Sequence, residues 1–174
     1  MLALLLAACG GREAQKSDWE IRNQDRLARE ATDREVLTRF PALPQRANLA
    51  EFSVIGAGDF RFYVDRASLS VGDNGVVRYT LVARSASGVD NITYEGARCA
   101  TGEHRIYAVG GEGAWRAGTG SWRALTQRWD VVLHREFFCP QGVPIRDSAE
   151  GLRALEQGGH PFSRGFGGDP YRRR

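Results

Sequence analysis

Cysteine and histidine are both scarce in this chain of 174 residues, which contains three of each. The chain has no Cys-x-x-Cys pair, and its histidines do not lie at the spacing of metal ligands, so we expect no metal site. It also lacks the Gly-x-Ser-x-Gly sequence of a hydrolase nucleophile and the Gly-Lys-Ser/Thr that follows a phosphate-binding loop. These absences predict a protein without a metal, a cofactor or a catalytic residue.

A strong charge of one sign is missing as well. The 24 Lys and Arg residues nearly balance the 21 Asp and Glu residues, which leaves a formal net charge of +3. Part of that excess belongs to the terminal run Arg172–Arg174, so the rest of the chain is close to neutral. Because a nucleic-acid-binding protein usually has a denser basic face, we expect no nucleic acid partner. With 42% hydrophobic and 26% charged residues, the composition is typical of one globular domain.

The chain begins with a short apolar segment that ends in Leu-Ala-Ala-Cys at Cys9. This segment is too short to span a bilayer, but it resembles the end of a bacterial lipoprotein signal peptide. We therefore expect removal of residues 1–8 and three acyl chains on Cys9, which would anchor the protein in the membrane. Gly10 in place of Asp favours the outer membrane, with the domain facing the periplasm. Since no Lys or Arg precedes Cys9, we expect translation to start upstream; the alternative is a cytoplasmic protein with a chance apolar start.

The other two cysteines form an even pair once Cys9 is lipidated. In an oxidising periplasm we expect a disulfide between Cys99 and Cys139. It would close a loop of about 40 residues and contribute roughly 4 kcal/mol to stability in the chain-entropy model. The alternative is two buried free thiols.

The middle of the chain predicts β-structure. Alternating apolar residues, branched and aromatic side chains and the turn Gly72–Gly75 indicate an antiparallel meander of four or five strands. The expected strands are residues 60–64, 68–71, 76–83, 91–99 and 104–109.

Helices are expected mainly after the strands. Helical spacing of apolar residues predicts one helix over residues 126–138, and a start signal at Asp147 with a Gly158-Gly159 stop predicts a second. The expected fold is therefore α+β, with one or two C-terminal helices packed on the sheet. The expected boundaries are a tether over residues 9–18, one globular domain over 19–157 and a disordered basic tail over 158–174. A charged surface helix over 21–40 and an extended segment at Pro41 and Pro44 would open the domain.

Several stretches resemble one known family. They are Leu43-Pro44, Phe60-x-Phe62-x-Val64-Asp65, Ser68 to Asp73, Gly75 to Val82, Tyr94-Glu95-Gly96-x-Arg98-Cys99, Tyr107-Ala108, Trp115, Trp122 and Phe137 to Pro140. This pattern resembles the cryptic neisserial protein (CNP1-like) family, small exported proteins of Gram-negative bacteria, many of them lipoproteins. The resemblance covers residues 19–157 and implies export and paired cysteines. It carries no catalytic residue over to this chain, because the family has no established activity.

Two sets of residues are candidates for a site. Trp115-Arg116 and Trp122-Arg123 could stack on glycan rings or dock an envelope protein; the alternative is that both indoles pack into the core. Asp65 and Glu95 could form a carboxylate pair for glycan cleavage, with His104 and His134 as further acid–base candidates. The alternative is that Asp65 caps a turn and Glu95 pairs with Arg98 or Arg78.

The leading hypothesis is a monomeric lipoprotein of the outer membrane that binds or scaffolds in the periplasm without catalysis. Its expected partners are the membrane, through the lipid on Cys9, and an envelope protein or cell-wall glycan. The alternative is a cell-wall or glycan-processing enzyme that uses a carboxylate pair. The Arg-rich C-terminus could contact anionic head groups or remain solvated.

Overall fold

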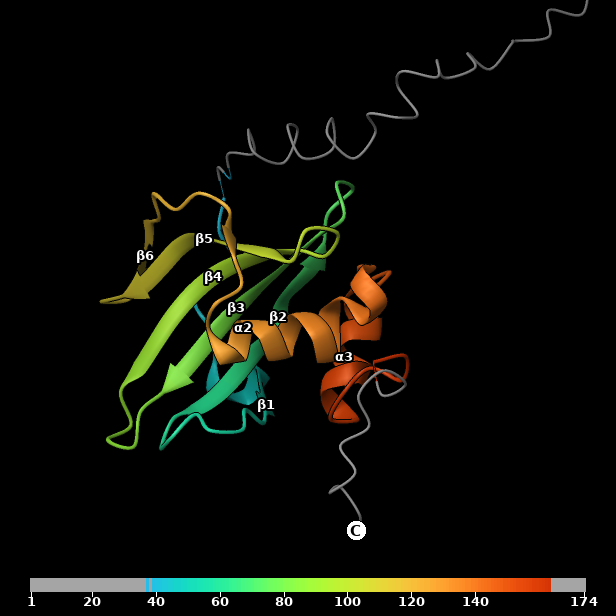
Figure 1. Cartoon of the computed structure of the whole chain (residues 1–174). Helices are drawn as coiled ribbons and strands as arrows, with labels where there is room; N and C mark the ends of the chain where they lie inside the picture. Colours follow the sequence, from blue (N-terminus) through green and yellow to red (C-terminus); the bar gives the residue numbers. More distant parts are fainter. Residues whose placement is uncertain (1–36, 38, 164–174) are drawn as a thin grey trace, which may run out of the picture. The chain divides into compact units, whose positions relative to one another are not determined.

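A computed structural model describes residue 37 and residues 39–163, which fold around one antiparallel sheet (Figure 1). The sheet has seven strands in the described part of the chain. They are β1 (Leu49–Phe52), β2 (Arg61–Val71), β3 (Val76–Arg84), β4 (Asp90–Arg98), β5 (Glu103–Gly111), β6 (Ala114–Ala117) and β7 (Arg123–Ala124). The helical elements are η1 (Arg46–Asn48), α2 (Arg128–Val132), η2 (Leu133–Phe138), η3 (Pro140–Gly142) and α3 (Ser148–Glu156).

The sheet is a meander, because β1 to β6 neighbour one another in chain order and β7 pairs with β5. The prediction of an antiparallel sheet with C-terminal helices is confirmed, but the predicted count of four or five strands is too low. The sequence pattern missed the short strands β1, β6 and β7, of four, four and two residues. Their pairing depends on longer neighbours, since strands of this length carry little periodicity of their own.

The predicted separation of residues 60–64 from 68–71 is also wrong. Both belong to β2, which continues through a bulge between Asp65 and Ser70. The Ser68 hydroxyl replaces a ladder partner there: it accepts a hydrogen bond from the Thr80 amide at 2.8 Å and donates to the Asp65 carbonyl at 2.9 Å. The bulge bends the strand without ending it.

The glycine-rich stretch after β5 is a hairpin and not a phosphate-binding loop. Gly110 pairs with Trp115, and the turn between them places Glu112 and Gly113 at φ values of 53° and 78°. Glycine adopts this left-handed conformation without steric cost, which explains its presence at the turn that starts β6.

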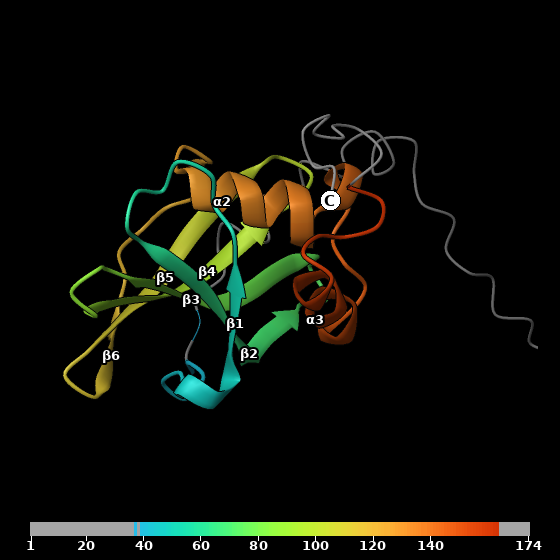
Figure 2. The same cartoon turned by 90° about the horizontal axis from the view of Figure 1, so that it is seen from below.

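The helices cover one side of the sheet (Figure 2). Their apolar side chains and those of β1 to β4 form the main core, in which the Trp129 and Phe62 rings stack with centroids 5.0 Å apart. The predicted helix over 126–138 is confirmed as α2 followed by η2, starting two residues later. The second predicted helix is confirmed as α3, whose N-cap Asp147 accepts a hydrogen bond from the Glu150 amide.

A second apolar cluster lies on the opposite face of the sheet. Tyr94, Tyr107 and Ala108 are buried there under Phe40, Leu37 and two tryptophans. The chain from Phe40 to Pro44 has no regular secondary structure and is tied down by Trp115, whose indole Nε1 donates to the Pro41 carbonyl at 2.7 Å. The prediction that Pro41 and Pro44 exclude a helix at this point is therefore confirmed.

The chain stays packed beyond α3. His160, placed by the sequence analysis in the tail, is 4% exposed, and its amide donates to the Glu136 carbonyl at 2.6 Å. The packed region therefore continues past residue 157. Cys9, the tether, the helix expected over 21–40 (apart from residues 37, 39 and 40) and the tail after Ser163 lie outside the described residues. Within residues 37–163, apart from residue 38, no helix has the length and apolarity needed to cross a membrane.

Candidate functional site

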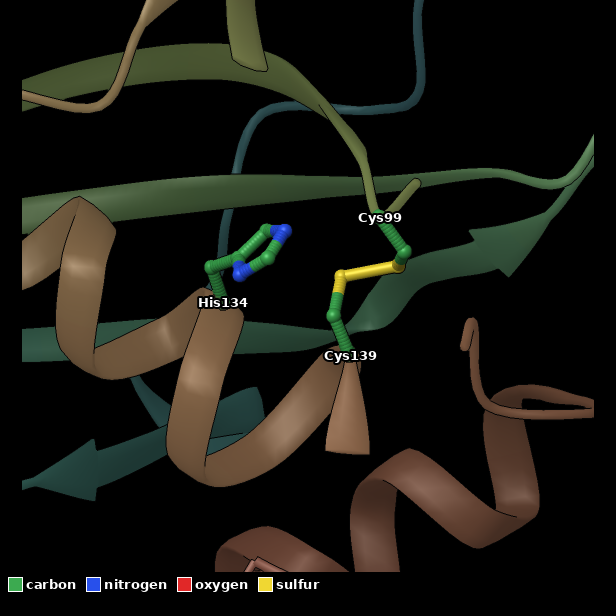
Figure 3. Close-up of side chains that lie close together, drawn as sticks. All are labelled: Cys99, His134 and Cys139. Carbon is green, nitrogen blue, oxygen red and sulfur yellow. A yellow bond between two sulfur atoms is a disulfide. The ribbon is translucent and has the colours of Figure 1, made fainter. Parts of the chain in front are cut away.

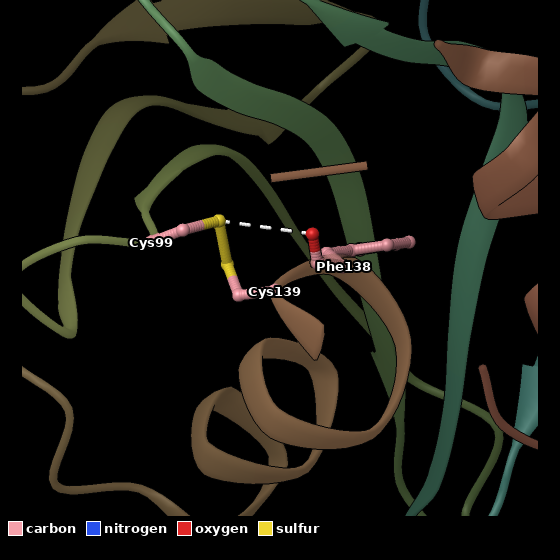
Figure 4. Close-up of a disulfide and its surroundings, with 3 residues drawn as sticks. All are labelled: Cys99, Phe138 and Cys139. Carbon is pink, nitrogen blue, oxygen red and sulfur yellow. Dashed lines mark hydrogen bonds between the residues drawn. A yellow bond between two sulfur atoms is a disulfide. The ribbon is translucent and has the colours of Figure 1, made fainter. Parts of the chain in front are cut away.

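A disulfide joins Cys99, at the end of β4, to Cys139, directly after η2 (Figure 3). Its Cα atoms are 5.2 Å apart, within the range that disulfides require. The sequence prediction of this pair is confirmed. The Cys99 sulfur also lies 3.7 Å from the Phe138 carbonyl oxygen (Figure 4). Since a disulfide sulfur carries no hydrogen, this is a packing contact, and the Ile145 amide donates to that carbonyl at 2.9 Å.

His134 lies beside the disulfide, with its ring directed from η2 towards β4 (Figure 3). One of its ring nitrogens lies within 4.8 Å of the two sulfurs, the spacing of a possible metal centre. The sulfurs are bonded to each other, however, and metals bind the thiolate form. Burial lowers the pKa of His134, so this histidine is a neutral packing residue near neutral pH.

The carboxylate pair expected from the sequence does not form. Asp65 lies opposite Thr80 on β3, whereas Glu95 lies opposite Tyr79. Because neighbouring residues of a strand point to opposite faces, Asp65 and Glu95 are on opposite sides of the sheet. The alternative of an arginine partner for Glu95 is also wrong. Arg98 pairs with Glu103 at 3.0 Å, Arg78 lies opposite Gly96 and so on the other face of the sheet, and Glu95 lies near His104.

The structure instead places Glu95 in a buried cluster with His104 and Asp130. The Nδ1 atom of His104 lies 3.6 Å from Oδ2 of Asp130 and 3.9 Å from Oε2 of Glu95. These residues come from β5, α2 and β4, and one nitrogen or oxygen of each lies within 4.8 Å of the others. Hydroxyl groups of Thr93 and Tyr79 donate to the two oxygens of Glu95, which fixes the direction of that carboxylate.

The three side chains open onto a pocket of about 170 Å³ between the sheet and α2. Its wall is largely apolar and includes Leu81, Ile106 and Trp129. Asp130 is 1% exposed, and neither of its carboxylate oxygens has a hydrogen-bond partner. A buried carboxylate without partners is costly, so this position requires an explanation beyond packing.

The ionisation of these groups follows from their surroundings. Burial raises the pKa of the Asp130 carboxyl to about 7, the Glu95 carboxylate adds to the increase, and His104 opposes it. The Glu95 carboxylate raises the pKa of His104, burial opposes this, and the charge of Asp130 supports it. Burial and the Glu95 charge raise the pKa of the Tyr79 hydroxyl, which therefore remains a hydrogen-bond donor.

The two tryptophans proposed for binding are half-buried and lie in the cluster on the opposite face. Trp115 contacts Phe40 and Tyr94, and Trp122 packs edge-on against Tyr107. Their indoles thus serve mainly in packing, in agreement with the alternative given above for these two residues. Arg116 and Arg123 next to them are exposed.

Sequence reasoning missed Asp130. It lies between Trp129 and Val131 in a stretch with helical periodicity, where a single acidic residue looks like an exposed position. Its partners are 26 and 35 residues away, so local spacing does not reveal them. The one available signal was the predicted packing of this helix on the strands that carry Glu95 and His104.

The comparisons with known proteins agree with the resemblance in the sequence. No curated protein and no solved structure matches the chain. The model of the CNP1-like family matches residues 28–156, which is more than half of the chain and contains all of the strands and the disulfide. The chain therefore belongs to the CNP1-like family.

Proposed function

We propose that this protein is an outer-membrane lipoprotein, anchored through Cys9, whose domain binds or scaffolds envelope components in the periplasm without catalysis. The disulfide between Cys99 and Cys139 is the observation that carries the proposal. Such bonds persist in oxidising compartments and are rare in the bacterial cytosol. The Leu-Ala-Ala-Cys segment supports the lipid anchor, since two or more acyl chains hold a protein firmly on a membrane.

The exposed arginines give the domain a surface for anionic partners. Arg116 on β6 and Arg123 on β7 are exposed on elements that both pair with β5. Trp115 and Trp122, which directly precede these arginines, pack against the cluster on the sheet. The carboxylates of cell-wall peptides, or acidic side chains of an envelope protein, would be suitable partners.

The first experiment measures the intact mass of the non-reduced protein after production from its own coding region in a Gram-negative host. The expected mass is that of a chain starting at Cys9, with three acyl groups added and two hydrogens removed. A Cys9→Ala variant should lose the lipid and leave the outer-membrane fraction. An unprocessed mass with free thiols would overturn the proposal.

The binding role is tested with purified peptidoglycan and with outer-membrane extracts. The double variant Arg116→Ala/Arg123→Ala should bind less than the parent protein. Arg153→Ala, which removes an exposed arginine from α3, is the matched control and should bind normally. Equal binding by all three proteins would exclude this surface.

A second candidate is an enzyme that uses Glu95 and Asp130. Two carboxyl groups in one pocket, one of them with a raised pKa, are typical of acid–base catalysis. The pocket of about 170 Å³ is smaller than the roughly 300 Å³ and above of typical ligand pockets, which disfavours a glycan substrate. New fragments released from peptidoglycan by the parent protein, but not by Asp130→Asn, would establish this alternative.

A further inference from the structure

In the cluster of Glu95, His104 and Asp130, two carboxylates share a single histidine. In the part of the chain that the structure describes, the ion pairs of both carboxylates involve only His104. Both carboxylates are buried, at 3% and 1% exposure. When both acids are ionised, even a protonated His104 leaves one negative charge in an apolar pocket, and buried charges are usually balanced by a partner or a metal.

The distances between these groups fit a metal ion. In a tetrahedral zinc site with bonds of about 2.0–2.1 Å, neighbouring ligand atoms lie about 3.3 Å apart. The distances of 3.6 and 3.9 Å from His104 Nδ1 to the two carboxylates exceed this value by only a few tenths of an ångström. One oxygen of each carboxylate also lies within 4.8 Å of the other, so rotations of the side chains would bring the three groups to one ion.

The surroundings of the cluster are also those of a metal site. Thr93 and Tyr79 hold Glu95 in place by hydrogen bonds, as outer-shell residues do for metal ligands. Asp130 has no such partner, so its oxygens are available to an ion. One nearby group opposes the binding of a cation: Arg123 on β7, whose positive charge acts on His104.

We propose that Glu95, His104 and Asp130 bind one divalent transition-metal ion, with zinc as the best fit. A nitrogen and two oxygen ligands suit this class, whereas Mg²⁺ and Ca²⁺ prefer oxygen alone. Three protein ligands would leave a fourth position on the ion, and the pocket that the three side chains line, together with Thr93 and Gln127, offers room for it. A water molecule or a small anionic ligand can occupy it. This inference is independent of the lipid anchor and of the arginine surface.

The test uses the full chain with Cys9→Ala, stripped of metal by a chelator and kept without reductant. Under these conditions Cys99 and Cys139 remain paired and offer no thiolate. Native mass spectrometry and calorimetry should show one Zn²⁺ per chain, and zinc should raise the melting temperature. Asp130→Asn and His104→Asn should each weaken binding tenfold or more.

The control is another carboxylate–histidine pair. Glu150 and His160 lie 3.2 Å apart, and neither belongs to the three-residue cluster. Glu150→Gln should therefore leave zinc binding unchanged. Asp130→Asn removes a buried charge without changing shape, so its metal-free form should melt at the same temperature as the parent or higher, which separates lost binding from lost folding.

A Co²⁺ complex identifies the ligands independently. The proposed site should give visible absorption bands of a distorted tetrahedral ion without a thiolate charge-transfer band. The proposal is overturned if no 1:1 complex forms, or if Asp130→Asn and His104→Asn bind zinc as the parent does. It is also overturned if His134→Asn alone abolishes binding.

Discussion

The guanidinium carbon of Arg98 lies 4.1 Å from the centroid of the Trp122 ring. Arg98 is 8% exposed and also forms an ion pair with Glu103 at 3.0 Å. A cation over the face of an indole is attracted by the ring's quadrupole, more strongly when the pair is shielded from water. One face of Trp122 is thus covered by the protein's own arginine and is not available for a glycan ring.

We therefore expect Trp122→Ala to destabilise the domain. The half-buried ring also contacts Tyr107, so the loss in unfolding free energy should be about 2 kcal/mol, below the value for a fully buried tryptophan. Chemical denaturation measures this loss. Arg123→Ala at the neighbouring exposed position should change stability by less than about 0.5 kcal/mol. An unchanged stability of Trp122→Ala, with loss of envelope binding, would favour the docking hypothesis instead.

Removal of the disulfide should cost more. The cysteines are 40 residues apart, and in the chain-entropy model a loop of this size corresponds to about 4 kcal/mol. The double variant Cys99→Ala/Cys139→Ala should lose about this amount in urea titrations performed without reductant. Reduction of the parent protein should give a similar shift, and Cys9→Ala should give none. If the double variant is as stable as the parent, the bond is not a structural one.

Asp130 should make metal-free stability fall as pH rises. Its pKa is about 7 in the folded state and 3.8 in the reference state, so the folded protein binds the extra proton between these values. The stabilisation is present below about pH 4 and is lost by about pH 7. The difference from Asp130→Asn should grow over this range by up to about 4 kcal/mol, and by less where water enters the pocket.

The comparison requires a chelator in every sample and denaturant titrations from pH 4 to 8. Glu150 provides an opposite trend, because the Arg146 amide lowers the pKa of its carboxyl to about 2. Its contribution is present above about pH 4.5 and is lost as the pH falls towards 2. Parallel pH profiles for the parent and Asp130→Asn would contradict the assignment to Asp130.

Gly96 should not tolerate alanine. A Cβ atom there would lie 2.7 Å from Cε2 of Tyr107 and 3.0 Å from Cγ1 of Val76, and both side chains are buried. Overpacking of this kind costs about 1–3 kcal/mol. Gly111→Ala on β5 is the control, because its Cβ would meet only the end of Arg116 at 3.8 Å. Thermal denaturation of the two variants should separate them, and equal melting temperatures would contradict the packing described.

The longer elements of the fold were predictable from the sequence, and the short ones were not. β3 and β4 were expected at their positions because both are long and contain branched and aromatic residues. The start of α3 was visible in the capping residue Asp147. By contrast, β1 and β6 are held in place by hydrogen bonding to β2 and β5. The local sequence pattern does not show which strands pair.

The candidate site was predictable only in part. Glu95 and His104 were singled out as ionisable residues, but Glu95 was paired with Asp65 on the wrong face. The error came from the unknown register, since the pairing of Asp65 with Thr80 and of Glu95 with Tyr79 decides on which face each carboxylate lies. Asp130 was missed because a single acidic residue within the apolar periodicity of its helix looks like an exposed position. The cysteine pair was found because the cysteine count, together with the expected export signal, pointed to a disulfide.

The disulfide has a mechanical consequence for the pocket. The helical segment that carries Asp130 follows β7 after a link of three residues and ends at Cys139, which is bonded to Cys99 directly after β4. Between these two attachments, Trp129 stacks on Phe62 and Arg128 donates a hydrogen bond to the Ile55 carbonyl. Because both ends of the segment are tied to the sheet, the helical wall of the pocket is restrained, and a guest has to fit the space between the two layers. Reduction of the disulfide would release one of the two attachments and leave that wall held at one end by the backbone alone.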